Sequence, residues 1–275
     1  VVGIGSVLNP YIVQDEYEPS LGETILAEYG GKDNITEAPA GTFNNINGDS
    51  ENNMYKMEDD YGTSYYFRGA KDYINNNIIF AEYQWKIVRI NGDGSIRLIY
   101  NGICPDNSCT INSTGEATIQ GANKFNSSYN DAKYVGYMYS PSGTTASTSR
   151  SEATSNVTNS TIKIHLDNWY ESNIYNTEYE AYISDTLFCN DRQLRSEVGG
   201  AATGPGYGDD YSTQTFYAAQ YRLYTNKTPS LLCGLKNDRF TVSDTTIGNG
   251  DLTYPVGLIT ADEMALAGMM YGTNN

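Results

Sequence analysis

Tyrosines and acidic residues flank a glycine-rich stretch in the C-terminal half of the chain. Aromatic rings beside carboxylates are typical of surfaces that bind sugars or proteins, because a ring gives a large contact area at a small entropic cost. Packing in strands accounts for these tyrosines equally well, so both interpretations stay open. The candidate ligand-binding residues are Tyr207, Asp209, Asp210, Tyr211, Tyr217 and Tyr221.

Pairs of adjacent acids could supply catalytic carboxylates or a calcium site. A glycosidase needs two carboxylates that face one sugar bond, and calcium prefers carboxylate oxygens. A strongly acidic chain contains many such pairs by composition alone, so we interpret them first as solvated loops. Calcium at Asp59 and Asp60 is the metal alternative. The acidic pairs are Asp59 with Asp60, Asp209 with Asp210, and Asp262 with Glu263.

The sequence gives little support for nucleophilic catalysis. His165 is the one histidine, and it lies in an apolar pattern without a GxSxG motif. One histidine cannot build a histidine-based zinc site. The GPGYG sequence at 204–208 lacks the lysine of a phosphate-binding loop. We therefore predict a protein that is not an enzyme and that needs no cofactor, apart from the calcium alternative.

Four cysteines predict two disulfide bonds and an oxidising compartment. Cys104 and Cys109 have the spacing of a short closed loop, and Cys189 and Cys233 would close a longer one. A zinc site of four thiolates is the alternative, but the chain has no CxxC pair. Four cysteines allow three pairings, and the sequence alone does not choose among them.

The composition is typical of a secreted or cell-surface bacterial protein. Among 275 residues only 18% are charged, and much of the polarity comes from Asn, Ser, Thr, Gly and 25 Tyr. The net charge of −16 repels phosphate backbones and anionic membranes, so nucleic acid is excluded as a partner. No apolar run reaches the length of about 20 residues that a membrane-spanning helix needs.

The clearest structural signal is a β-hairpin at Phe80–Tyr100, which we expect at the centre of the fold. Its two arms alternate with period two, and Asn91–Gly94 supplies the residues of a tight turn. The turn overlaps part of a calcium loop, but Arg89 occupies the first ligand position. Apolar residues on both faces predict a covered scaffold. A hairpin that instead lined a pocket of converging acids would favour an enzyme.

Three further segments have the pattern of helices, separated by long loops. Ser20–Tyr29 begins with a capping signal, Thr161–Asn173 carries one apolar stripe, and Asp262–Met270 follows a capping threonine. Pro141–Thr161 consists almost entirely of small and polar residues, which predicts an exposed and mobile loop.

The C-terminal stretch GLITADEMALAG at 257–268 resembles a helix signature of the sulfatase-modifying branch of C-type-lectin-like folds. Ile259 stands where that signature has proline, and Met264 where it has tryptophan. The resemblance implies an α+β, β-rich, C-type-lectin-like fold around the central hairpin, with long loops and a few short helices. Such folds continue with further strands, so we expect strands beyond Asn275 or from the N-terminal segment. The copper-binding cysteine pair of the oxidase branch has no counterpart here, so that activity is not implied.

A wider set of motifs resembles a group of uncharacterised secreted and surface proteins of gut Firmicutes. Some members of that group begin with a pilin-like leader, so the resemblance implies surface exposure and allows self-assembly. The motifs are DDYGTSYYFRG (59–69), WKIVRINGDGSIRLIY (85–100), YNDAKYVGYMY (129–139), FCNDR (188–192), RLYTNKTPSLLC (222–233) and LTYPVGLITADE (252–263).

Together these observations predict an N-terminal extension over residues 1–57 and one lectin-like domain over 58–275. We expect an extracellular or cell-surface protein that binds a glycan or protein ligand without catalysis. The alternatives are a subunit of an extracellular filament, in which residues 1–19 pair with a neighbour's sheet edge, and a carbohydrate-active enzyme. The enzyme would use the acids near Asp59 and Asp60 or near Asp209 and Asp210.

Overall fold

The hairpin predicted at Phe80–Tyr100 forms the middle of an antiparallel sheet. Its arms are β5 (Tyr83–Ile90) and β6 (Ile96–Ile103), and the strand order is β1-β6-β5-β3-β2, with β4 also paired to β5. The other strands of this sheet are β1 (Val2–Ile4), β2 (Asn52–Asp59), β3 (Gly62–Gly69) and β4 (Asn77–Phe80). The hairpin is therefore central, as predicted.

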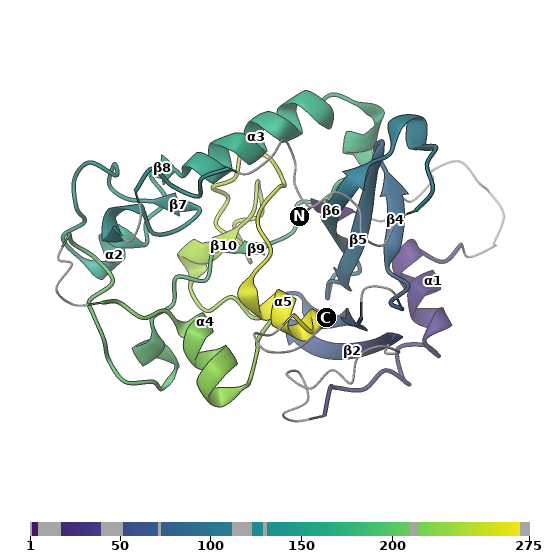
Figure 1. Cartoon of the computed structure of the whole chain (residues 1–275), viewed down its shortest axis with the longest axis horizontal. Coiled ribbons are helices and arrows are strands. Elements are labelled where there is room, and N and C mark those ends of the chain that lie inside the picture. The colour runs from purple at the N-terminus through teal and green to yellow at the C-terminus, as the bar shows by residue number, and fades with distance from the viewer. Residues whose placement is uncertain are drawn as a thin grey trace.

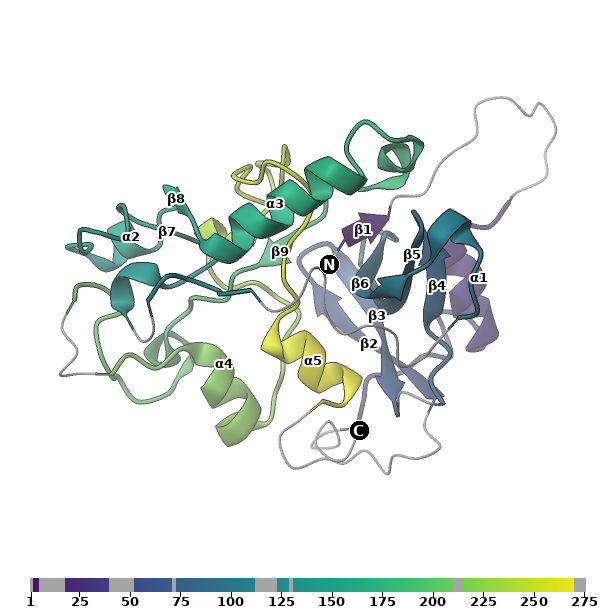
Figure 2. The ribbon, with the colours of Figure 1, turned by 45° about the horizontal axis from the view of Figure 1, so that its top comes forward.

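The computed structural model describes residues 2–4, 18–39, 52–70, 73–111, 123–128, 131–209 and 214–269. In Figure 1 the sheet lies on one side, and a lobe of loops, short helices and two-stranded ladders lies on the other. Both views place α5 between these two parts, and α3 runs along both of them (Figure 1; Figure 2). The result is a mixed α+β fold, as predicted, without a closed barrel in the described residues.

Both faces of the hairpin are buried, which confirms the interpretation of its interrupted alternation. The pairing of β5 with β6 shifts register between Ile87 and Arg89, and such a bulge changes which side chains share a face. Trp85 and Leu98 are almost fully buried in the main core. On the side of the lobe, the tip of the hairpin meets the turn between β2 and β3, where Gly92 and Gly62 are in close contact.

The helices stand where the capping signals predicted them. They are α1 (Leu21–Glu28), α3 (Thr161–Asn173) and α5 (Ala261–Ala267). α1 begins with a capping box, in which the Glu23 N–H donates to Ser20 Oγ at 3.2 Å and the Ser20 N–H donates back to the Glu23 carboxylate at 3.0 Å. Each bond satisfies a backbone donor or side-chain acceptor at the start of the helix.

The main core forms where α3 packs against the sheet. The Trp169 ring lies 5.4 Å from Tyr83 and 6.2 Å from Trp85, measured between ring centroids. Leu26 of α1, Ile35 and Met54 of β2 belong to the same core. The predicted domain boundary at residue 57 therefore falls inside β2, and the described part of residues 18–57 packs with the sheet.

The second lobe contains short elements. They are α2 (Arg150–Ala153), β7 (Met138–Tyr139), β8 (Thr158–Asn159), β9 (Phe188–Cys189), β10 (Arg239–Phe240), α4 (Ala218–Gln220), a π-helical turn at Tyr221–Asn226, and 3-10 turns at Ala132–Tyr134, Arg195–Val198 and Lys236–Asp238. Two further 3-10 turns, at Pro105–Asn107 and Glu178–Tyr182, lie beside the sheet, where the Tyr179 ring meets Phe80 of β4 at 5.6 Å. β7 pairs with β8, and β9 pairs with β10. Among the described residues, no helix has both the length and the apolar character to cross a bilayer.

The prediction that Pro141–Thr161 is an exposed loop is wrong. The segment contains α2 and β8, and three of its polar residues are buried: Ser147, Thr154 and Ser160. The physical reason is Arg192, which is only 2% exposed. Its guanidinium donates to the Met138 and Thr154 carbonyls, both at 2.9 Å, and pairs with Asp238 at 2.7 Å.

Both predicted disulfide bonds are present. Cys104 is bonded to Cys109, and Cys189 is bonded to Cys233. The first closes a short loop after the hairpin, and the second links β9 to a segment 44 residues later in the chain. Two disulfides are consistent with an extracellular protein.

Candidate functional site

A cavity of about 240 Å³ lies where four distant segments of the chain meet. β9 and β10 supply one part of its wall, and the segments before β7 and before α5 supply the rest. Its lining residues are mostly aromatic or aliphatic, and Asp191 is the one charged side chain among them. They are Phe125, Tyr137, Phe188, Cys189, Asn190, Asp191, Phe240, Leu258, Ile259, Thr260 and Ala261.

The aromatic wall is held by contacts within the protein. The β9–β10 ladder places Phe188 opposite Phe240, and the Phe240 ring meets the Tyr137 ring edge-on at 5.9 Å. The Tyr137 hydroxyl donates to the Val256 carbonyl at 3.2 Å. Gly257 passes so close to Phe188 that a Cβ there would lie 2.6 Å from the ring. The rings are therefore fixed before any ligand arrives, as in most small-molecule sites.

Asn190 lines the cavity and also positions its aromatic wall. Its Oδ1 accepts the Tyr137 N–H at 2.7 Å. Its Nδ2 is buried, has no hydrogen-bond partner within the described part of the chain, and lies against Gly136. Because this nitrogen is covered by protein, the amide fixes Tyr137 and leaves the polar contact with a ligand to the next residue.

Asp191 is the charged group at the edge of the cavity. It has a φ of +54°, a left-handed conformation that is uncommon outside glycine but tolerated by aspartate. Its Oδ2 accepts from Arg222 at 2.5 Å, and no described residue donates to its Oδ1. Burial raises the pKa of this carboxyl to about 6, although the charge of Arg222 opposes the rise.

Beyond Asp191 lies a pocket of about 20 Å³, which has room for about one water. Arg89 and Arg97 of the hairpin line it, so the hairpin does reach a pocket of converging acids. Each acid there is already paired with an arginine, however. The pairs are Arg89 with Glu263 (3.0 Å), Arg97 with Glu263 (3.2 Å), Arg222 with Asp262 (2.8 Å) and Arg222 with Asp191.

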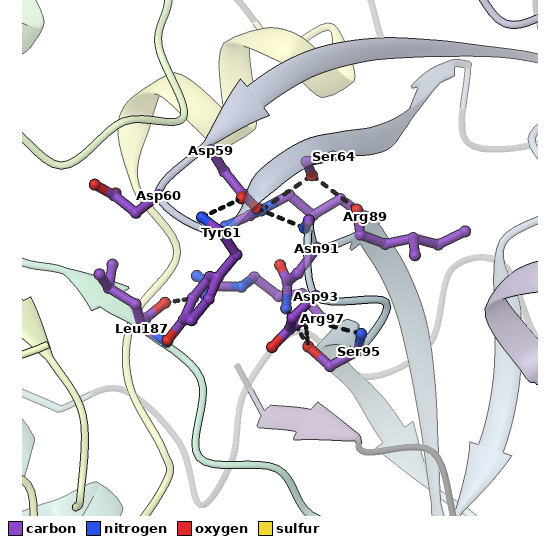
Figure 3. A network of polar contacts seen from close by, with 12 residues as sticks. Asp59, Asp60, Tyr61, Ser64, Arg89, Asn91, Asp93, Ser95, Arg97 and Leu187 are labelled. Atoms are coloured by element: carbon purple, nitrogen blue, oxygen red, sulfur yellow. Dashed lines mark hydrogen bonds and ion pairs between the residues drawn. The ribbon is translucent and has the colours of Figure 1, made fainter. Parts of the chain in front are cut away.

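Asp59 and Asp60 are both paired with cations. Asp59 forms an ion pair with Arg89, and it accepts the N–H groups of Tyr61 at 2.8 Å and Gly92 at 3.1 Å (Figure 3). Asp60 pairs with Arg239 at 3.1 Å and accepts the Cys233 N–H at 2.8 Å.

These environments do not fit the proposed calcium site, because a calcium ion would have to displace an arginine from each carboxylate. Within the described ranges, no group of three or more potential metal ligands comes together. The interpretation of the acidic pairs as solvated loops is also wrong for Asp59, Asp262 and Glu263, which are buried.

The structure does not gather the predicted tyrosine site into one surface. Tyr207 is half-buried and Asp209 exposed, while Asp210 and Tyr211 lie outside the described residues. Tyr217 forms an isolated antiparallel β-bridge with Leu194, and burial raises the pKa of the Tyr217 hydroxyl. The guanidinium carbon of Arg195 lies 5.2 Å from the centroid of the Tyr221 ring. None of the described members of this set lines the cavity of about 240 Å³.

Sequence reasoning missed the cavity because its lining comes from segments that lie far apart in the chain. A usable signal was nevertheless present. Two of the motifs that carry the resemblances, 188–192 and 257–268, together supply eight of the lining residues. Within the sequence the two motifs lie far apart, and no local pattern predicts that they form one site.

Comparison of the chain with protein-family models, with curated proteins and with solved structures gave no match. The resemblance to C-type-lectin-like folds and to surface proteins of gut Firmicutes therefore stays a prediction.

Proposed function

We propose that this chain is an extracellular, non-catalytic binding or adhesion protein that recognises a glycan or protein ligand. The observation that carries the proposal is the preformed aromatic cavity with one carboxylate at its edge. Sites for small groups are concave and mostly apolar, with a few placed polar groups. A volume of about 240 Å³ is below the roughly 300–1,000 Å³ of drug-sized pockets, so the cavity suits one compact unit of a larger ligand.

The surroundings of the candidate catalytic groups support binding rather than catalysis. The carboxylates of Asp59, Asp60 and Glu263 are each held by an arginine. His165 lies on α3, where its Nε2 is 3.1 Å from the side chain of Asn123, and it does not line the cavity. A general acid or base needs a carboxyl or imidazole that can reach the substrate. In the described lining of the cavity Asp191 is the one carboxyl, whereas a glycosidase needs two.

A binding panel tests the proposal. The oxidised protein would be applied to a glycan array and to immobilised mucin and matrix proteins, with the disulfide-reduced protein as the control. We expect the oxidised protein to bind at least one glycan or protein class. A blank panel would count against the proposal, and cleavage of a bound glycan would favour the carbohydrate-active enzyme instead.

The second candidate function, a filament subunit, is favoured by one observation. β1 pairs with the edge of β6 in the register Val2↔Leu98, Gly3↔Arg97 and Ile4↔Ile96. An edge that accepts a short N-terminal strand from its own chain can accept the same strand from a neighbour. Electron microscopy of the concentrated full chain and of a variant without residues 1–4 tests this. Fibres formed by the full chain alone would support it, and monomers in both samples would oppose it.

A further inference from the structure

We infer that the cavity binds one neutral pyranose unit of a glycan, with the exposed Phe125 ring and the half-buried Leu258 and Ile259 against the apolar face of the sugar ring and Asp191 accepting its hydroxyls. This inference rests on the proposed binding function and narrows its ligand to one chemical class. It assigns the contact to a place in the fold that is separate from the tyrosine set around Gly204–Gly208.

The polar contact follows from the free capacity of Asp191. Its Oδ2 is bonded to Arg222, while Oδ1 accepts no hydrogen bond from the described residues. The side chain keeps 16% of its surface exposed, so a ligand in the cavity can reach it. A carboxylate oxygen has two acceptor positions, and a sugar hydroxyl is a donor of matching size. The hydrogen bond would be charge-assisted, which makes it stronger than one between neutral groups.

The buried rings of the aromatic wall offer a cationic ligand little cation–π attraction. The guanidinium of Arg97 already lies 4.8 Å from the Phe188 ring centre, and the ammonium of Lys163 lies 5.9 Å from the Tyr137 ring centre. These two rings are only 2% and 4% exposed and each already has a positive charge beside it, so they offer a cation in the cavity no free ring face. The cation–π attraction that aromatic cages offer to quaternary ammonium groups is therefore reduced here.

An anionic ligand is disfavoured as well. Arg222, the arginine bound to Asp191, is shared with Asp262, so it has little attraction left for a third negative group. The chain as a whole carries a net charge of −16, which repels acidic sugars over a longer range. A neutral ring with an apolar face and several hydroxyls satisfies both the wall and Asp191.

Phe125 and Ala261 line the cavity and are exposed, so we place its mouth between them. Phe125 is 45% exposed, and its carbonyl accepts the N–H of Ile162 at 3.2 Å, which ties this residue to the start of α3. Ala261 is exposed at the first position of α5 and also lines the cavity. The opening between these segments would let the neighbouring sugars of the chain extend into solvent.

Saturation-transfer NMR with glucose, galactose, mannose and N-acetylglucosamine tests the inference, with choline as the cationic probe. We expect at least one sugar to bind and choline not to bind. Ala261→Trp would place a large ring at the mouth and should weaken sugar binding at least tenfold. Its matched control is Ala181→Trp, another exposed alanine that does not line the cavity, and this variant should bind like the unchanged protein.

Asp191→Asn tests the polar contact, because the amide keeps the shape of the carboxylate but loses its charge. We expect about tenfold weaker binding. If the variant does not fold, Ala261→Trp decides. In the unchanged protein, binding should also weaken as the pH falls through about 6, where Asp191 gains a proton. The charged groups that face Asp191 are Arg222, Asp262 and Asp238.

Three results would overturn the inference. These are unchanged affinity in Ala261→Trp, binding of choline in preference to sugars, or binding of protein ligands alone in the array. The last result would leave the proposed binding function intact, whereas a blank array together with blank NMR spectra would remove both.

Discussion

Among the single residues, Glu263 of the acidic pairs has side-chain contacts that no local sequence pattern predicts. The sequence places it in the capping signal of a helix, and its backbone does serve that purpose, since its N–H donates to Thr260 Oγ1 at 3.1 Å. Its side chain is 3% exposed and accepts from both Arg89 and Arg97. Those arginines lie more than 160 residues earlier in the chain, so no local pattern announces the contact.

The pKa of Glu263 follows from this environment. Burial alone would raise it, but Arg97 and Arg89 outweigh burial and lower the pKa to about 2. A carboxyl whose pKa is lower in the folded state than in the unfolded chain stabilises the fold above its ordinary pKa of about 4.5. That stabilisation is lost as the pH falls from about 4.5 to about 2.

We predict that Glu263→Gln lowers the free energy of unfolding by about 3–5 kcal/mol at pH 7, because Arg97 would be left in the interior without its carboxylate. Urea unfolding at pH 7 and at pH 3 measures this. The difference between variant and unchanged protein should shrink at pH 3. Glu178→Gln, at an exposed position, is the matched control and should change the stability by less than about 0.5 kcal/mol. An equal loss at both pH values would contradict the assignment.

Among the elements, the turn of the hairpin contains two glycines, Gly92 and Gly94, that are required for different structural reasons. Gly94 has a φ of +85° and open space around it, so it serves the turn itself. Gly92 lies against the turn between β2 and β3. A Cβ at Gly92 would be 2.5 Å from the Gly62 nitrogen and 2.7 Å from Asp59 Oδ1. The sequence predicted the turn, but it could not predict the docking of one turn on another.

We predict that Gly92→Ala destabilises the protein more than Gly94→Ala does. The first change forces backbone apart at a packed contact, at a cost of up to about 3 kcal/mol. The second carries only the cost of a left-handed alanine, about 1 kcal/mol. Urea unfolding compares the two variants. Hydrogen exchange should show faster exchange at the Tyr61 amide in Gly92→Ala alone, and equal exchange in both variants would contradict the docking.

The elements that the sequence predicted well are those whose signals are local. α1, α3 and α5 each begin at a capping residue, and the hairpin has its turn residues within five positions. The segment 141–161 has no such signal, because its structure depends on Arg192, which lies 31 or more residues later in the chain. Composition predicted an exposed loop there, and a single buried guanidinium overrides that tendency.

The candidate site was hidden for the same reason. Each wall residue looks ordinary within its own segment: Phe188 and Phe240 are short-strand residues, and Tyr137 precedes one. Only the ladder between β9 and β10 brings the rings to one cavity. Asp191 could not be distinguished from the other acids, because burial in the folded chain raises its pKa against the effect of Arg222, and Arg222 occupies one of its two oxygens.

In the molecule as a whole, the two disulfide bonds constrain chain segments of very different length. Cys104 and Cys109 are five positions apart, so their bond constrains one short loop. Cys189 and Cys233 are 44 positions apart, and their bond ties β9, a wall of the cavity, to the segment whose N–H group binds Asp60. The longer closure removes more freedom from the unfolded chain.

We therefore predict that replacing Cys189 and Cys233 by serine costs more stability than replacing Cys104 and Cys109. Loop-closure entropy gives about 4 kcal/mol for the longer loop and about 2 kcal/mol for the shorter one. Thermal unfolding of the two double variants under oxidising conditions measures the difference, and the reduced unchanged protein should be less stable than either. The loss of Cys189–Cys233 should also weaken binding in the cavity, whereas the loss of Cys104–Cys109 should leave binding unchanged. If the short-loop variant were the less stable of the two, chain closure would not govern the stability. Equal binding by the two variants would show that the cavity wall does not depend on the Cys189–Cys233 bond.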